Sequence, residues 1–189
     1  MKKTAIIIGI LAASFINVLA QDVNLSYNKA FVGEYAAEQN VEAEALLYRE
    51  VNYYRVLNGV DPVAISERIV GYATRFGNYT VSKHNTPEDN FYEHSKFGPD
   101  SLQIPVTCSE IIHMVYFDHK PSPVELCAGL MYGISRPPSA PVVGWTQSPG
   151  HKETLLQDIV KYYGAAIYVF RTTHNWWVCF GIVNFSTTQ

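Results

Sequence analysis

The sequence predicts an α/β fold in which a β-sheet lies between two layers of helices. Two runs near the C-terminus, 164–170 and 176–185, are apolar on both alternating faces, and earlier segments repeat apolar residues at helical spacing. A strand that is apolar on both faces must be covered on both sides. The earlier helices can supply both covers, so we expect a three-layer α-β-α sandwich. The short segment between the two runs predicts that they form a hairpin.

The first twenty residues have the pattern of a secretory signal. Lys2 and Lys3 give a basic start, residues 5–16 form an apolar run, and small residues precede a cut after Ala20. The apolar run is shorter than the about 20 residues of a membrane-spanning helix. The alternative is that these residues stay uncleaved and anchor the chain in a membrane. We expect a secreted or periplasmic protein with no membrane span once the signal is removed.

Removal of residues 1–20 leaves 189 − 20 = 169 residues, which suits one domain. It also removes two lysines, so the formal net charge becomes −3 − 2 = −5. Nucleic-acid binding needs clustered Lys and Arg, and no such cluster is present. The sequence has no P-loop, dinucleotide fingerprint or His-Glu-x-x-His helix. We predict an irregular lead-in over 21–42 and a single domain over 43–189.

Three helices are predicted from the spacing of apolar residues and from residues that typically begin or end a helix. Apolar residues spaced by 4, 4 and 3 predict a helix over about 39–57, which Asn58-Gly59 ends. Ser66 is a predicted cap for a second helix, and Pro121-Ser122-Pro123 opens a third. One face of the first helix is predicted to hold Ala43, Leu47, Val51 and Tyr54, and the inner face of the second Ile69, Ala73 and Phe76. The third helix contains Val124, Leu126, Cys127, Leu130 and Met131.

Three polar residues are predicted to share one pocket: His94, Glu110 and His151. Glu110 stands at the edge of the apolar run 110–117, a strand or a short buried helix, where a carboxylate is costly to bury unless it is paired. The break Ser148-Pro149-Gly150 turns the chain and starts a new helical turn at His151. His94 lies in a long segment without periodicity, 83–107, of the length that is usually functional or disordered.

The chain has three cysteines, Cys108, Cys127 and Cys179. Export permits a disulfide, and the favoured pair is Cys108–Cys127, which would contribute about 3 kcal/mol through a short loop. Cys179 lies in an apolar run and is predicted to be a buried thiol. A catalytic cysteine needs an electropositive, partly exposed setting, which the sequence does not show.

Four stretches, in this order, resemble the CAP superfamily of cysteine-rich secretory, antigen 5 and pathogenesis-related class 1 proteins, in its prokaryotic, SCP-like form. The resemblance covers about residues 43–185. Its motifs are Asn52-Tyr53-Tyr54-Arg55, His94-Ser95, Cys108-Ser109-Glu110-Ile111 and Trp145-x-x-Ser148-Pro149-Gly150-His151.

The resemblance implies an α-β-α sandwich whose cavity gathers two histidines and two acidic residues. Carried over to this chain, these are His94, His151 and Glu110, with Ser148 at the position of the second acid. Ile111 stands where the family has asparagine, a second departure. The family is reported to hold sterols or other lipids, or to act on protein partners.

Two functions follow as expectations. The preferred one is an extracellular binding module in which His94, Glu110 and His151 hold a divalent cation such as zinc, with one position open. An apolar ligand could lie in a groove lined by tyrosines near the first helix and by Leu130, Met131 and Pro137. The alternative is a metal-dependent, peptidase-like hydrolase with Glu110 as its catalytic residue.

Two simpler interpretations stay open beside these functions. The three polar residues could form a hydrogen-bonded cluster that binds no metal, and the predicted groove residues could be ordinary core and rim packing. Asn52 and Arg55 are interpreted as structural hydrogen-bonding residues rather than ligands.

Overall fold

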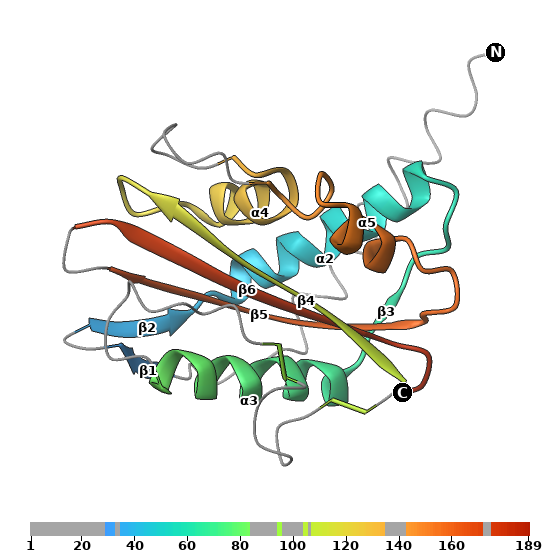
Figure 1. Cartoon of the computed structure of the whole chain (residues 1–189), viewed down its shortest axis with the longest axis horizontal. Coiled ribbons are helices and arrows are strands. Elements are labelled where there is room, and N and C mark those ends of the chain that lie inside the picture. The colour runs from blue at the N-terminus through green and yellow to red at the C-terminus, as the bar shows by residue number, and fades with distance from the viewer. Residues whose placement is uncertain are drawn as a thin grey trace.

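A six-stranded sheet with helices on both faces forms the frame of the protein (Figure 1). The computed structural model describes residues 29–32, 35–83, 94–95, 104–105, 107–134, 143–171 and 175–189. The predicted signal and the tip of the C-terminal hairpin lie outside these residues. Within them, no helix combines the length and apolar character needed to cross a membrane. Because the chain combines helices with a β-sheet, it is of the mixed α/β class that the sequence predicts.

The strands run in the order β1-β2-β5-β6-β4, with β3 beside β5. The long strands β4, β5 and β6 pair antiparallel, and β5 and β6 form the predicted hairpin. Alternation along β6 is as predicted, with Cys179 and Val183 on one face and Phe180 and Ile182 on the other. The strand bounds are β1 Lys29–Val32, β2 Tyr35–Gln39, β3 Ala64–Ile65, β4 Cys108–Phe117, β5 Tyr162–Arg171 and β6 Trp177–Ser186.

The helices confirm the predicted elements with small shifts at their ends. The first begins after Asn40, whose side chain accepts the backbone N–H of Ala43 at 2.9 Å, and ends at Asn58. Ser66 precedes the second helix as predicted, but its buried hydroxyl has no partner among the described residues and makes no cap. The helix bounds are α2 Val41–Leu57, α3 Glu67–Lys83, α4 Pro123–Tyr132 and α5 Pro149–Leu155.

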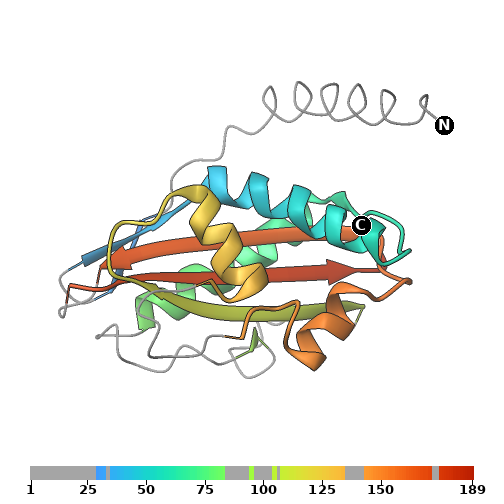
Figure 2. The same ribbon diagram turned by 90° about the horizontal axis from the view of Figure 1, so that it is seen from above.

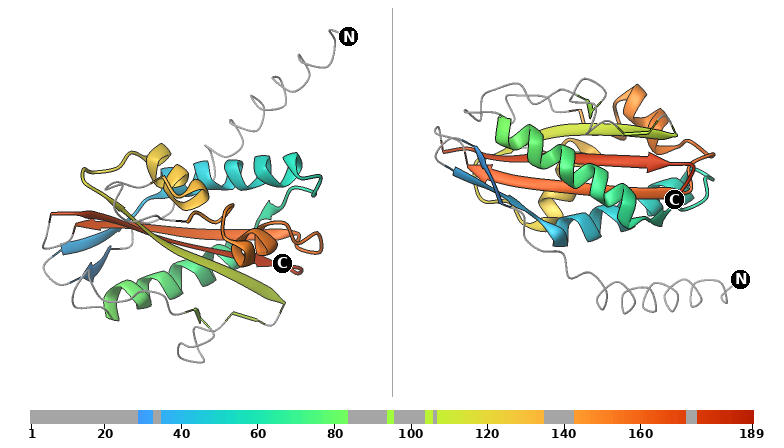
Figure 3. Two further views of the ribbon diagram at one scale, coloured as in Figure 1. Left: turned by 45° about the horizontal axis from the view of Figure 1, so that its top comes forward. Right: turned by 90° about the horizontal axis from the view of Figure 1, so that it is seen from below.

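Helices α2 and α3 lie on opposite faces of the sheet (Figures 2 and 3). A core of buried side chains lies on each face. The α2-side core joins α2, α4 and α5 to the sheet, and the α3-side core joins α3 to the other face. Helix α3 crosses β5 at Gly164, where a Cβ atom would lie 2.2 Å from the backbone nitrogen of Val70. Only glycine permits so close an approach. The strands are covered on both sides, as their apolar faces predict.

The predicted irregular lead-in contains two strands instead. Strands β1 and β2 form a hairpin within residues 29–39, and β2 pairs with β5 through Glu38 opposite Val169 and Gln39 opposite Tyr168. The sheet thus extends upstream of the predicted boundary at residue 43. These strands are only four and five residues long, so they offer little sequence pattern to predict them from.

The predicted Cys108–Cys127 disulfide is wrong, because the three cysteines are free. Cys108 begins β4, whereas helix α4, which carries Cys127, packs over the other end of that strand, with Gly129 beside Val115 and Phe117. From Cys108 to Val115 the strand rises about 23 Å, far beyond the spacing of a disulfide. Burial raises the pKa of the Cys127 thiol to about 12.

We expect the unreduced, unfolded protein to react with an alkylating reagent at all three cysteines. Intact-mass spectrometry before and after alkylation measures the number of adducts, and prior reduction with dithiothreitol should add none. A single adduct without reductant, rising to three after reduction, would contradict the structure.

Candidate functional site

Strand β4 organises the candidate site, and it lies at one edge of the described sheet. Its side chains alternate between the two cores. Those on the α2 side include Ile111, Val115 and Phe117, and those on the α3 side include Ile112 and Met114. By this period of two, His113 faces the α2 side and Glu110 faces the α3 side. Glu110 and His113 therefore face opposite sides of the sheet.

Glu110 is a buried carboxylate whose two oxygens both accept hydrogen bonds. Its side chain is 4% exposed. Oε1 lies 3.1 Å from Nδ1 of His94 and accepts the backbone N–H of Ser95 at 2.8 Å. With its amide oriented so that both ends find partners, Asn184 donates to Oε2 at 3.2 Å and accepts the Ala73 N–H at 3.3 Å. The expected basic partner for this carboxylate is thus His94.

The contact with Glu110 sets the chemistry of the His94 ring. A carboxylate beside Nδ1 favours the tautomer that carries its proton there, which leaves the lone pair on Nε2. The His94 side chain is 34% exposed, so this ring lies at the rim of the site. A carboxylate that orients an imidazole in this way is the usual outer partner of a metal-binding histidine.

His151 lies on the other side of β4 and adjoins His113, for which the sequence predicts no role in the site. It is the third residue of α5, which begins at Pro149, two residues before the helical turn predicted at His151. Its ring centre lies 6.5 Å from that of His113, and the ring of Trp145 lies 6.5 Å from His113 on the same face. Trp145 is fully buried and donates from Nε1 to the Ile112 carbonyl at 3.4 Å.

The histidine pair on the α2 side is kept neutral by its surroundings. Burial, and then the neighbouring His151, lowers the pKa of His113 to about 4. Burial also lowers the pKa of His151, with a further contribution from the charge of His94.

The structure therefore brings the three predicted residues together only in part. Glu110 and His94 are in contact, whereas His151 adjoins His113 across the strand. The part of the chain that the structure describes holds no group of three His, Cys, Asp or Glu side chains placed to bind one metal ion. The three predicted ligands thus do not form a ready-made zinc site in this arrangement, and zinc binding stays a prediction.

Arg55 fixes the helix that carries His151. Its side chain is fully buried, and it donates from Nε to the Asp61 carbonyl at 2.8 Å and from Nη1 to the Leu155 carbonyl at 2.6 Å. Leu155 is the last residue of α5, so Arg55 ties α5 to the end of α2. Asn52, one turn earlier, exchanges two hydrogen bonds with the backbone of Val63. Both residues are structural, as interpreted from the sequence.

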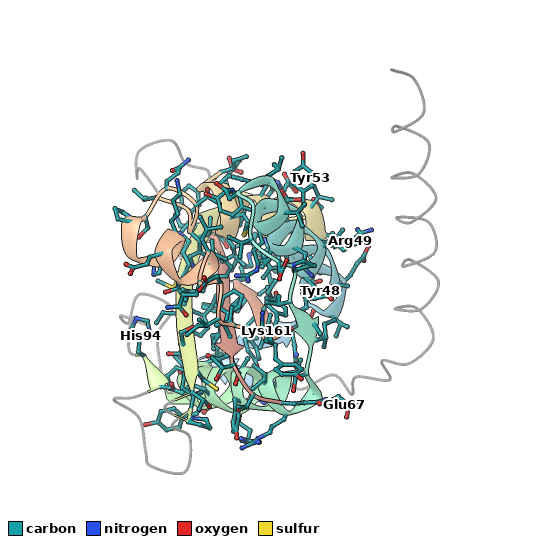
Figure 4. The ribbon with its side chains drawn as sticks, turned by 90° about the vertical axis from the view of Figure 1, so that its right-hand side faces the viewer. Tyr48, Arg49, Tyr53, Glu67, His94 and Lys161 are labelled. Carbon is teal, nitrogen blue, oxygen red and sulfur yellow. The ribbon has the colours of Figure 1, made fainter. Side chains whose placement is uncertain are left out.

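A separate pocket lies between α2 and α4. Its volume is about 400 Å³, within the size range of small-molecule sites. The lining is mixed apolar and charged: Leu46, Arg49, Glu50, Tyr53, Val124, Cys127, Ala128 and Tyr132. Tyr53 does line a groove, as predicted, but Leu130 and Met131 are buried in the core, and Pro137 lies outside the described residues. Figure 4 shows Arg49 and Tyr53 on the opposite side of the molecule from His94.

Comparisons with known proteins bear on the fold. No family model matches the sequence, and no curated protein matches it. Among solved structures, an outer surface protein of Borrelia burgdorferi is similar with a TM-score of 0.51 and 16% sequence identity, over 87% of this chain and 100% of that chain. The likeness shows the fold alone. It supports a mixed α/β architecture over most of the chain.

Sequence reasoning missed two members of the site, His113 and Asn184. Both are polar residues inside strongly apolar strands, and both are buried, with His113 9% exposed and Asn184 fully enclosed. A buried polar residue needs a partner or a role, so each position carried a signal. Counting two residues at a time along 110–117 would also have separated His113 from Glu110.

Proposed function

We propose that the chain is an exported, CAP-like binding module whose pocket at the edge of β4 takes a divalent cation through His94 and His151. Glu110 orients His94 in this proposal and does not bind the cation. The supporting observation is the 3.1 Å contact between Nδ1 of His94 and Oε1 of Glu110, which leaves Nε2 as the ligand nitrogen. The signal-like first twenty residues and the name of the similar outer surface protein support an extracellular location.

The surroundings of Glu110 favour binding over hydrolysis. A general base must reach the water that it activates. Both oxygens of this carboxylate already accept hydrogen bonds from His94, Ser95 and Asn184, and the side chain is 4% exposed. The hydrolase alternative needs this same carboxylate as its base, so the arrangement offers it no support.

Zinc titration by calorimetry at pH 7.5 tests the proposal. All proteins should carry His119→Leu, because the exposed His119 contacts Asp118 and Glu125 and could itself attract zinc. We expect one zinc ion per parent chain and no binding in His94→Ala or His151→Ala. Glu110→Gln should weaken binding by about 10–100-fold, the usual effect of losing an orienting carboxylate. Zinc binding that survives replacement of both histidines would overturn the proposal.

An apolar ligand in the α2–α4 pocket is a second candidate, favoured by the pocket itself. We expect solvent extraction of the purified protein to release a bound lipid that mass spectrometry detects, and Tyr53→Ala to reduce its amount. His151→Ala should leave it unchanged, because that residue lies at the other site. A wild-type protein without extractable lipid, and without uptake of an added fatty acid, would exclude this function.

A further inference from the structure

Two adjacent histidines on the α2 side of β4 each bury a ring nitrogen that has no partner among the described residues. These atoms are Nε2 of His113 and Nδ1 of His151. The two ring centres are 6.5 Å apart. Native proteins pair nearly all of their buried polar atoms, so two unpaired nitrogens in neighbouring rings call for a common explanation.

The spacing of the rings suits a shared ion. With metal–nitrogen bonds of about 2.0–2.1 Å and about 1.2 Å from a ring nitrogen to the ring centre, two imidazoles on one ion have centres up to about 6.5 Å apart. The observed 6.5 Å is at this limit. A tetrahedral angle at the ion would bring the centres to about 5 Å, so binding draws the two rings closer together.

The chemistry of the pair also suits a cation ligand. A ring nitrogen binds metal through its lone pair, and Nε2 of His113 and Nδ1 of His151 have no hydrogen-bond partner among the described residues that would occupy it. His113 is fixed on a central residue of β4 and lies beside the fully buried Trp145. A ring held in this way loses little freedom when it binds an ion.

We propose that His113 is a ligand of the cation pocket and binds the same ion as His151, through Nε2 of His113 and Nδ1 of His151. The inference rests on the proposed function, because it adds a third imidazole to the cation assigned to His94 and His151. His113 lies outside every motif on which the family resemblance rests. In this proposal the ion has three nitrogen ligands once the side chains of His94, His113 and His151 move toward it, because in the structure no three such groups of the described residues surround one ion. Glu110 is the orienting group of His94.

Cobalt(II) is the probe for this proposal, because its visible absorption bands report the number and kind of its ligands. In the His119→Leu parent, His113→Leu should weaken cobalt binding by more than about 100-fold, beyond the loss expected for a residue that only orients a ligand. Any residual bands should change shape as a nitrogen ligand is lost. Met114→Leu, at the next position of β4 but on the α3 side, is the matched control and should leave binding unchanged.

The His113→Leu variant should fold, because leucine suits an apolar strand and removes a buried nitrogen that has no partner. Circular dichroism checks this point. Unchanged cobalt affinity and bands in folded His113→Leu would overturn this inference and leave the proposed function intact. Binding that depends on His113 and His151 but persists in His94→Ala would uphold the inference and overturn the assignment of His94. A parent that binds neither cobalt nor zinc would overturn both.

Discussion

Replacement of Arg55 by alanine is expected to destabilise the protein by about 3–5 kcal/mol, because hydrogen bonds from a buried charged group contribute about 1.5–3 kcal/mol each. Two such bonds are lost, to the carbonyls of Asp61 and Leu155. Both carbonyls then need new partners, and a cavity replaces a fully buried side chain. Urea unfolding followed by circular dichroism measures the change.

The same variant should also weaken the cation pocket. Arg55 holds the last carbonyl of α5, and α5 carries His151. Arg55→Lys is the matched variant, because lysine keeps the charge but cannot reach two carbonyls with a fixed fork of donors. We expect about half the destabilisation for lysine. An alanine variant within about 1 kcal/mol of the wild type would show that α5 is held by apolar packing alone.

The helices of this fold were predictable because their signals are local. Ala43, Leu47 and Val51 repeat on one helical face and are all fully buried in α2, and Asn58-Gly59 ends that helix. The strands of the C-terminal hairpin were predictable for a similar reason, since each is apolar on both faces. Strands β1 and β2 were missed because they are short and gain their order from pairing with each other and with β5, a long-range contact.

The site could be predicted only in part, because some of its contacts follow from local chemistry and others from how distant segments pack. A buried carboxylate needs a partner, so the sequence predicted a basic or metal partner for Glu110, and the structure supplies His94. The side of the sheet on which α5 packs depends on tertiary contacts that no local pattern contains. His151 therefore meets His113 rather than Glu110, because successive β4 side chains face opposite cores. The cysteine pair failed similarly, because closeness in sequence says nothing about the length of the strand between the two residues.

Glu44 is expected to make the stability of the protein fall as pH rises from 5 to 8. Burial raises the pKa of this carboxyl from 4.5 to about 7, partly offset by hydrogen bonds from the Ile167 N–H and the Gln39 amide. Its folded pKa lies above its unfolded value, so its stabilising contribution is complete below about 4.5 and is lost as pH rises through about 7. The loss between pH 5 and 8 is about 2.5 kcal/mol.

Glu44→Gln isolates this effect, because glutamine has the shape of the protonated carboxyl and cannot ionise. Burial lowers the pKa of His113 and His151, so these residues oppose the trend by favouring the folded state as pH rises. The informative quantity is therefore the difference in unfolding free energy between variant and wild type, measured by urea unfolding across this pH range. Relative to the wild type, the variant should gain about 2.5 kcal/mol from pH 5 to pH 8.

Glu42→Gln, which removes an exposed carboxylate from the same helical turn, is the control. A difference that stays constant with pH would mean that Glu44 ionises as readily in the folded protein as in the unfolded chain.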